Sequence, residues 1–115
     1  MQKDGYVVHY ATFPSTVIPA EVAKAHGITR AESRQVSNIS VLKDGMAVRA
    51  EVTGTAKNLL SQILDLEFLE VKEQESIYYL ASIVTGKRDR LDYAIRVRPL
   101  ASEHTFIINF QRRYE

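Results

Sequence analysis

The sequence contains no cysteine, which excludes disulfides, thiolate metal sites and cysteine nucleophiles. It also has no apolar run near the roughly 18 to 20 residues that a transmembrane helix requires. Neither sign of charge dominates, because 15 Lys and Arg residues and 14 Asp and Glu residues leave a formal net charge of +1. The two signs are interspersed along the chain. We therefore expect neither a nucleic acid partner nor a transmembrane segment.

Motifs for metal binding, nucleotide binding and nucleophilic catalysis are missing as well. The spacing of the histidines along the sequence does not match that of metal ligands. The histidines are His9, His26 and His104. The stretch VTGTAKN lacks the GxxxxGK[ST] spacing of a phosphate loop. His9 could form a triad with a serine, but no GxSxG motif surrounds the candidates, Ser15, Ser33 and Ser40. We expect no catalytic residue, no metal and no cofactor.

Apolar and polar residues alternate along most of the chain, as in half-buried antiparallel strands. In RLDYAIRVRP, the positions on one face are Leu91, Tyr93, Ile95 and Val97. MAVRAEVTG and TFIINFQRRY show the same alternation, whereas SIYYLASIV is apolar on both faces and predicts a more central strand. A chain of 115 residues suffices for one core, so we expect a single domain spanning 1–115.

Turn residues separate these strands at regular intervals. Asp44-Gly45 matches a two-residue hairpin turn, because both residue types tolerate the positive φ that such turns need. The stretch GKRDR, Gly86–Arg90, predicts a charged hairpin tip. In LLSQILDLEFLEVKE the apolar parity switches, which predicts a β-bulge near Phe68. The spacing of the turns predicts an all-β, antiparallel sandwich or barrel of about seven strands.

The connection from Pro14 to Gln35 breaks this rhythm and carries helix signals of its own. Pro19 suits a first helical position, Glu21 favours the N-terminal end, and Gly27 can end a helix with positive φ. These signals predict one short helix, Pro19–His26, after the first strand. We expect it to cap one end of the sheets.

Several stretches, in this order, resemble one family of small exported bacterial proteins, domain of unknown function family 4426. The resemblance covers nearly the whole chain through YVVHYATFPSTVIPAEVAKAHGITRAESRQVSNISVL, VTGTAKNLL, LEFLEVKEQESIYYLA and YAIRVRP. It implies an immunoglobulin-like β-sandwich and a periplasmic location, with no established activity. Members normally carry a signal peptide, whereas this chain opens with MQKDGY. We therefore expect a periplasmic protein whose signal peptide has been removed, with a cytoplasmic protein as the alternative.

The stretch SNIS places a small polar cluster in a predicted strand. Asn38 and Ser40 would share one face, opposite Ile39 and Val41, as an outward polar surface. The triplet Asn-Ile-Ser also satisfies the glycosylation sequon, which acts only in a glycosylating secretory pathway. A third interpretation is that Asn38 hydrogen-bonds the irregular segment before it. We favour this third interpretation, in which Asn38 tethers the helical segment.

Two consecutive tyrosines give the best indication of binding. Tyr78 and Tyr79 must face opposite sides of a strand, so one can enter the core while the other reaches outward. By contrast, we expect a cluster of glutamates to be a solvated strand edge and turn: Glu67, Glu70, Glu73 and Glu75. The complete candidate binding or structural patch comprises His9, Tyr10, Ser15, Thr16, Arg30, Asn38, Ser40, Asn58, Tyr78 and Tyr79.

Two classes of function are consistent with these features. The first is a non-catalytic periplasmic or cell-envelope protein that binds another protein or an envelope component. An exposed sheet edge or an open apolar groove would favour it. The alternative is a small-ligand-binding protein or hydrolase with a pocket between the helical cap and the sheets. A closed pocket that gathers His9, Arg30 and Asn38 would favour this alternative. The identity of the partner and the oligomeric state do not follow from the sequence.

Overall fold

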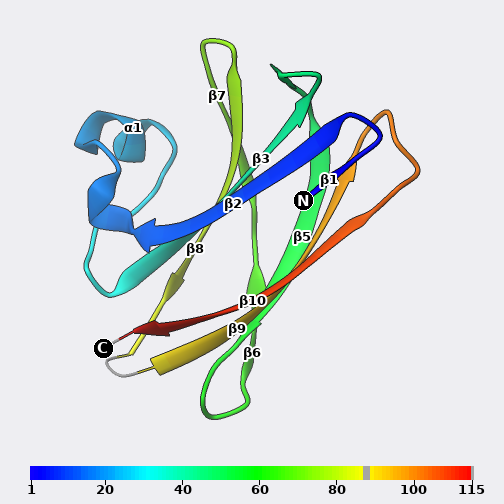
Figure 1. The fold of residues 1–115 in the computed structure, drawn as a ribbon. Coiled ribbons are helices and arrows are strands. Elements are labelled where there is room, and N and C mark those ends of the chain that lie inside the picture. The colour runs from blue at the N-terminus through cyan, green and yellow to red at the C-terminus, as the bar shows by residue number, and fades with distance from the viewer. Residues whose placement is uncertain (87–88, 115) are drawn as a thin grey trace.

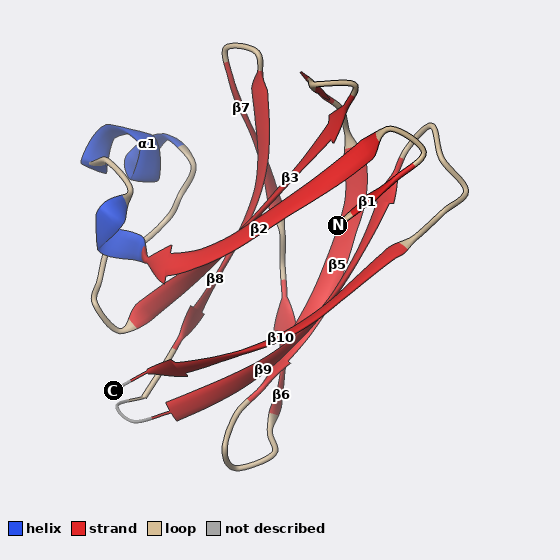
Figure 2. Cartoon of the chain, viewed as in Figure 1, coloured by secondary structure: helices blue, strands red, loops and turns tan. Residues whose placement is uncertain are grey.

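The computed structural model of the protein, which describes residues 1–86 and 89–114, is built almost entirely from antiparallel strands (Figures 1 and 2). Its elements are β1 Gln2–Lys3, β2 Tyr6–Pro14, a 3-10 turn Ser15–Val17, α1 Ala20–Ala25, β3 Arg34–Lys43, β4 Met46–Ala47, β5 Ala50–Lys57, β6 Ile63–Leu66, β7 Leu69–Glu73, β8 Ser76–Val84, β9 Asp89–Pro99 and β10 Phe106–Tyr114. The predicted charged tip joins β8 to β9, but two of its residues, 87 and 88, lie outside the described residues.

The strands form two sheets that pack as a sandwich. The six-stranded sheet has the order β1-β2-β3-β8-β7, with β4 added beside β3, and the four-stranded sheet has the order β10-β9-β5-β6. All neighbouring strands are antiparallel. The prediction of an antiparallel β-sandwich with one short helix is therefore confirmed. The immunoglobulin-like strand arrangement that the resemblance implies stays a prediction.

The predicted alternation places the core between the sheets. In β9, Leu91, Tyr93, Ile95 and Val97 are each at most 2% exposed, while Arg96 between them is exposed. The strand predicted to be central, β8, lies between β3 and β7. Its Tyr79, Ala81 and Ile83 join the core, together with further side chains from both sheets: Val8, Ile39, Val41, Ala56, Phe106 and Ile108. Burial on one face of each sheet supplies the main driving force for this fold.

The hairpin turn between β3 and β4 has the predicted geometry. Asp44 and Gly45 both adopt positive φ, 50° and 84°, and Lys43 pairs with Met46 across the turn. Positive φ at both central residues matches the twist of the two strands, which is why Asp-Gly is favoured there. The predicted hairpin is confirmed.

The predicted β-bulge near Phe68 is wrong. β6 ends at Leu66 in the four-stranded sheet, and β7 begins at Leu69 in the six-stranded sheet. Glu67 and Phe68 carry the chain from one sheet to the other, a path that Figure 1 shows between β6 and β7. The apolar parity changes because the two halves belong to different sheets whose inner faces point toward each other.

The predicted helix is present as α1, and Gly27 ends it. Gly27 has φ 69°, its N–H donates to the carbonyl of Lys24, and the N–H of Ile28 donates to the carbonyl of Ala23. This pair of bonds is a Schellman motif, which satisfies carbonyls that the helix leaves unpaired. Figure 2 shows the helical segment beside the sheets.

The helical segment packs on a face of one sheet instead of capping the end of both. Ile18 and Ala23 form a small buried cluster with Val36 of β3, next to Phe13 and Leu80. These strand residues have the opposite parity to the core residues, so they lie on the outer face of the six-stranded sheet. We call residues 15–31 the cap. The cap covers only part of this outer face, and the candidate site begins where it stops.

Candidate functional site

Four of the residues proposed from the sequence gather on the outer face of the six-stranded sheet beside the cap. His9 pairs with Ser40 across β2 and β3, and Asn38 lies two residues further along β3 on the same face. Leu80 pairs with Asn38, which places Tyr78, two residues before it in β8, on that face as well. We call His9, Asn38, Ser40 and Tyr78 the outer patch.

Asn38 does not tether the cap. Its Oδ1 atom is buried and has no hydrogen-bond partner among residues 1–86 and 89–114. Its cross-strand neighbours are Ala11 and Leu80, whose side chains offer no donor. The prediction of an Asn38 tether is therefore wrong. Among the described residues, the Asn38 Oδ1 atom is an unpaired buried acceptor beneath the outer patch.

The tether is formed by Ser15 at the start of the cap. The Ser15 side chain is fully buried, and its Oγ donates to the Ala31 carbonyl at 3.0 Å and accepts from the Ala31 N–H at 2.8 Å. Arg30 donates to the Thr16 carbonyl at 2.9 Å in the same place. Three proposed site residues, Ser15, Thr16 and Arg30, thus close the two ends of the cap onto each other. Their position indicates a structural role.

The two consecutive tyrosines face opposite sides, as predicted. Tyr79 is 4% exposed, and its hydroxyl accepts from the Ala50 N–H at 2.9 Å and donates to Glu70 Oε2 at 2.8 Å. Arg49 Nε donates to the same carboxylate oxygen at 3.1 Å. Arg49 and Ala50 lead into the four-stranded sheet, whereas Tyr79 and Glu70 belong to the other sheet. Glu70 therefore helps to join the sheets and is not a freely solvated glutamate.

This network shifts the ionisation of its members. The hydrogen bond from Tyr79 is the largest cause that lowers the pKa of Glu70 below its usual 4.5, followed by the bond from Arg49. Burial is the largest cause that raises the pKa of Tyr79. Both shifts favour a charged Glu70 and a neutral Tyr79, which are the forms that the observed hydrogen bonds require.

We expect Glu70 to make stability depend on acidic pH. Its folded pKa is lowered, so its contribution is complete above the usual carboxyl pKa of 4.5 and is lost as pH falls through the folded pKa. Urea unfolding of the protein and of Glu70→Gln should therefore show a difference in free energy that is largest near neutral pH and shrinks below about pH 4. A difference that stays constant with pH would contradict this linkage.

Tyr10 belongs to a stack of aromatic rings at the side of the sandwich where β2 and β10 lie. Its ring stacks on Phe110 at 4.8 Å between centroids, and Phe110 stacks on Tyr93 at 4.6 Å. The Arg112 guanidinium lies 4.8 Å from the centre of the Phe110 ring. Tyr93 is fully buried and Tyr10 is 41% exposed, so the stack leads from the core to the surface. The alternation of this stretch indicates only a strand, so the sequence does not single out Phe110 or Arg112 as site residues.

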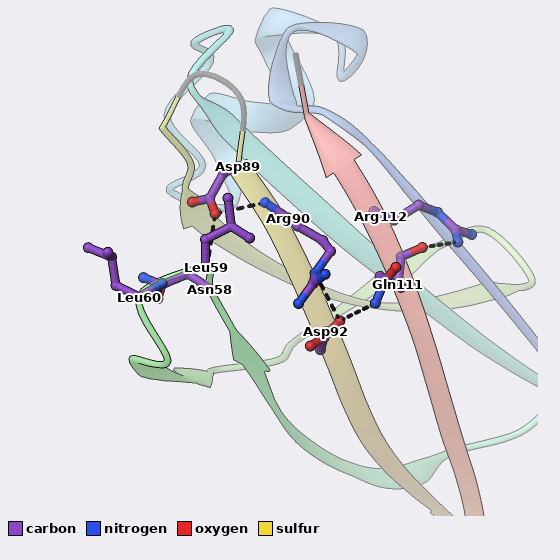
Figure 3. A network of polar contacts seen from close by, with 8 residues as sticks. All are labelled: Asn58, Leu59, Leu60, Asp89, Arg90, Asp92, Gln111 and Arg112. Atoms are coloured by element: carbon purple, nitrogen blue, oxygen red, sulfur yellow. Dashed lines mark hydrogen bonds and ion pairs between the residues drawn. The ribbon is translucent and has the colours of Figure 1, made fainter.

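Asn58 lies apart from the other proposed site residues, in the turn between β5 and β6. Its Oδ1 accepts the backbone N–H groups of Leu60 and Gln62 at 3.0 and 2.9 Å. Figure 3 shows this turn beside the start of β9, where Asp89 Oδ1 accepts the N–H of Leu59 at 3.3 Å. Side-chain bonds of this kind fix a turn. Asn58 therefore has a structural role, and the turn that it holds presents Leu59 and Leu60 to solvent.

The outer patch is an open surface and not a closed pocket. His9 is exposed, and Arg30 is engaged with Thr16 in the cap. A depression of about 660 Å³ lies elsewhere, at an end of the sandwich. In the described part of the chain, no three His, Asp or Glu side chains come together as metal ligands. No helix formed by the described residues has the length and apolar character to span a membrane.

The fold and the outer patch define a capped, two-sheet β-sandwich, and comparisons with known proteins place it in a family. Residues 1–114 match the domain of unknown function DUF4426. The crystal structure of a DUF4426 family protein from Pseudomonas aeruginosa PAO1 is similar, with 32% sequence identity, a TM-score of 0.88, and coverage of 98% of this chain and 90% of that chain. The chain belongs to the DUF4426 family. No curated protein matches it.

Proposed function

We propose that this protein is a non-catalytic protein of the bacterial cell envelope that binds an extended segment of another protein along the edge of β2. The proposal rests on one observation. Within the described residues, β1 pairs with β2 at Tyr6 and Val7 through Lys3 and Gln2, and Met1 extends this cover to Val8. The rest of that edge, as far as Pro14, pairs with no described strand. Free strand edges are templates for a strand from a partner.

The hydrogen bonds at Val8 indicate which groups of β2 face the free edge. The Val8 N–H donates to the Met1 carbonyl at 2.8 Å, and the Val8 carbonyl accepts from the Met1 amine at 3.1 Å. Residues two apart in an antiparallel strand direct their N–H and C=O groups to the same side. The backbone groups of Tyr10 and Thr12 therefore face away from β3 and are available to an added strand.

The surroundings of this edge suit protein recognition. Tyr10 sits on the free edge as the exposed end of the aromatic stack, and a rigid aromatic side chain is a common anchor at interfaces. His9 and Ala11, both exposed, are the outer-face residues next to the same edge, and the outer patch continues from them. An added strand could thus use main-chain bonds for affinity and these side chains for specificity.

The geometry near His9 does not support the hydrolase alternative. The neighbours of His9 on its face are Ser40 across the strand pair, Asn38 and Leu42 diagonally, and Val7 and Ala11 along β2. None of them is an acid that could orient the imidazole for nucleophilic catalysis. Arg30 is held by Thr16 in the cap. The patch is therefore better suited to binding than to acyl transfer.

A backbone substitution at Thr12 tests the binding edge. Thr12→Pro removes the N–H that faces the free edge and leaves the bonds to β3, so it should abolish pairing with a partner at little cost in stability. Thr12→Val, which keeps that N–H, is the matched control. Affinity capture from native cells, with the full-length protein as bait, should retain the same partner with the native protein and Thr12→Val, but not with Thr12→Pro. Equal retention by all three would refute binding along β2.

The envelope location is a separate part of the proposal. It follows from the resemblance, which implies export, and binding along β2 does not depend on it. We expect the full-length protein, tagged at its C-terminus, to appear in the periplasmic fraction after osmotic shock. Recovery with a cytoplasmic marker would refute the location while leaving the binding edge untouched.

A further inference from the structure

A polar cavity opens between the two sheets, at the end of the sandwich where β3 begins and where β8 and β10 end. Its volume is about 660 Å³, and its lining includes Glu32, Gln35, Thr85, Gly86, Arg113 and Tyr114. It is separate from the outer patch, and it reaches β2 only at its end, where Gln35 pairs with Pro14 on the side opposite the free edge. Its size falls within the roughly 300 to 1,000 Å³ of small-molecule sites.

Gln35 is a buried amide on the inner face of the sandwich. It has the same parity in β3 as Ile39 and Val41, which belong to the core, yet it is a polar residue with only 8% of its surface exposed. Its side chain makes no hydrogen bond with another residue in 1–86 and 89–114. The Gln35 amide lines the cavity, so both its N–H donors and its acceptor can pair with a ligand there.

The neighbouring hydroxyls are already engaged and frame the cavity. The Tyr114 hydroxyl lies 3.0 Å from that of Tyr93, and Thr85 Oγ1 donates to the Ser33 carbonyl at 3.3 Å. The Thr85 N–H donates to the same carbonyl at 2.7 Å. These bonds hold the walls from both sheets in place, and Gln35 lines the space between them.

Two opposite charges stand at the mouth of the cavity. Glu32 precedes β3 and Arg113 lies near the end of β10, and both are exposed. They form no ion pair with each other, nor with any other described residue. Glu32 can accept hydrogen bonds from an ammonium group, and Arg113 can bind a carboxylate through two parallel bonds.

We propose that this cavity binds a small zwitterion, a molecule with one ammonium and one carboxylate group. Glu32 binds the ammonium group, Arg113 binds the carboxylate, and the Gln35 amide donates to the carboxylate of an amino acid or to a carbonyl of a peptide. A free amino acid and the two termini of a short peptide share this chemistry, and the experiment below distinguishes them. Gly86 at the rim leaves room for entry, since a Cβ added there would meet no atom within 4 Å.

Titration of the ¹⁵N-labelled protein with trialanine and, separately, with alanine tests the proposal. At least one of the two should shift the side-chain amide signals of Gln35 and the backbone signals of Arg113 and Tyr114. The stronger ligand shows whether a peptide or a free amino acid is preferred. N-acetyl-trialanine and trialanine amide each lack one charge, so each should bind about tenfold more weakly than trialanine if the peptide is the ligand. The N-acetylated and amidated forms of alanine apply the same test to the free amino acid.

Substitutions then test the three contacts. Gln35→Leu, Glu32→Gln and Arg113→Gln should each raise the Kd about tenfold. Arg96→Gln, on the exposed outer face of β9, is the control and should leave the Kd unchanged. Gly86→Phe adds a ring at the rim and provides a second test if Gln35→Leu fails to fold. The absence of shifts with both compounds, equal binding of the blocked forms, or a Kd unaffected by the cavity substitutions would overturn the proposal.

Discussion

Gly54→Ala is expected to lower the free energy of unfolding by about 3 kcal/mol. A Cβ added at Gly54 would lie 2.8 Å from the Ala94 carbonyl oxygen and 3.1 Å from the Ile95 Cα and Cγ1 atoms. The oxygen and the Cα belong to the backbone of β9, and every residue of β5 pairs with that strand. Neither can move aside without breaking the ladder. The two central strands of the four-stranded sheet would have to separate.

Gly86 is the other glycine whose φ is not positive, and it provides a matched control. A Cβ at Gly86 would meet no atom within 4 Å, so Gly86→Ala should change the free energy of unfolding by about 0.5 kcal/mol or less. Equilibrium unfolding in urea, at fixed temperature and pH, measures both variants. If Gly54→Ala proves as stable as Gly86→Ala, the close approach of β5 to β9 is not the reason for glycine at position 54.

Features that depend on neighbouring residues could be predicted from the sequence. The burial of Tyr93 and Ile95 follows from a period of two, because successive side chains point to opposite faces of a strand. The turn at Asp44-Gly45 follows from the positive φ that both residues adopt. The end of α1 follows in the same way from Gly27. Each of these features is decided within a few residues, so the local pattern contains enough information.

Features that depend on which strands become neighbours could not be predicted. The parity change near Phe68 looks the same whether one residue bulges or the chain crosses to the opposite sheet, and the second occurs here. The parity of β3 does place Gln35 on the inner face, but nothing local shows that a cavity would lie beside it. The outer patch likewise depends on how β2, β3 and β8 are aligned with one another. The sequence of one strand does not determine this register.

The choice of tether shows the same limit within one motif. Ser15 and Asn38 can both hydrogen-bond to backbone groups, so the residue types alone do not distinguish them. The path of the cap determines which of the two residues forms the tether. It brings Ala31 back against Ser15 and leaves Asn38 between Ala11 and Leu80. Packing of Ile18 and Ala23 on Val36 fixes that path. The tether is therefore a consequence of tertiary packing.

Ser15→Ala is the second substitution for which we expect a large effect, about 2 to 3 kcal/mol in the free energy of unfolding. The fully buried Ser15 hydroxyl serves both the N–H and the carbonyl of Ala31, and alanine would leave these two backbone groups without their partner. The cap should then open before the sheets do, because local unfolding starts where the packing is weakest. Limited proteolysis should accordingly begin between residues 15 and 31.

Asn38→Ala provides the contrast that separates a tether from an unused polar group. The Asn38 Oδ1 atom has no partner among the described residues, so its removal leaves no backbone group unpaired. The free energy of unfolding should change by less than about 1 kcal/mol, and the first proteolytic cuts should not move into the cap. Ser40→Ala, on the same outer face, should be similarly mild. If Asn38→Ala opened the cap as readily as Ser15→Ala, Asn38 would hold the cap through contacts other than its Oδ1 atom, and the assignment of the tether to Ser15 would fail.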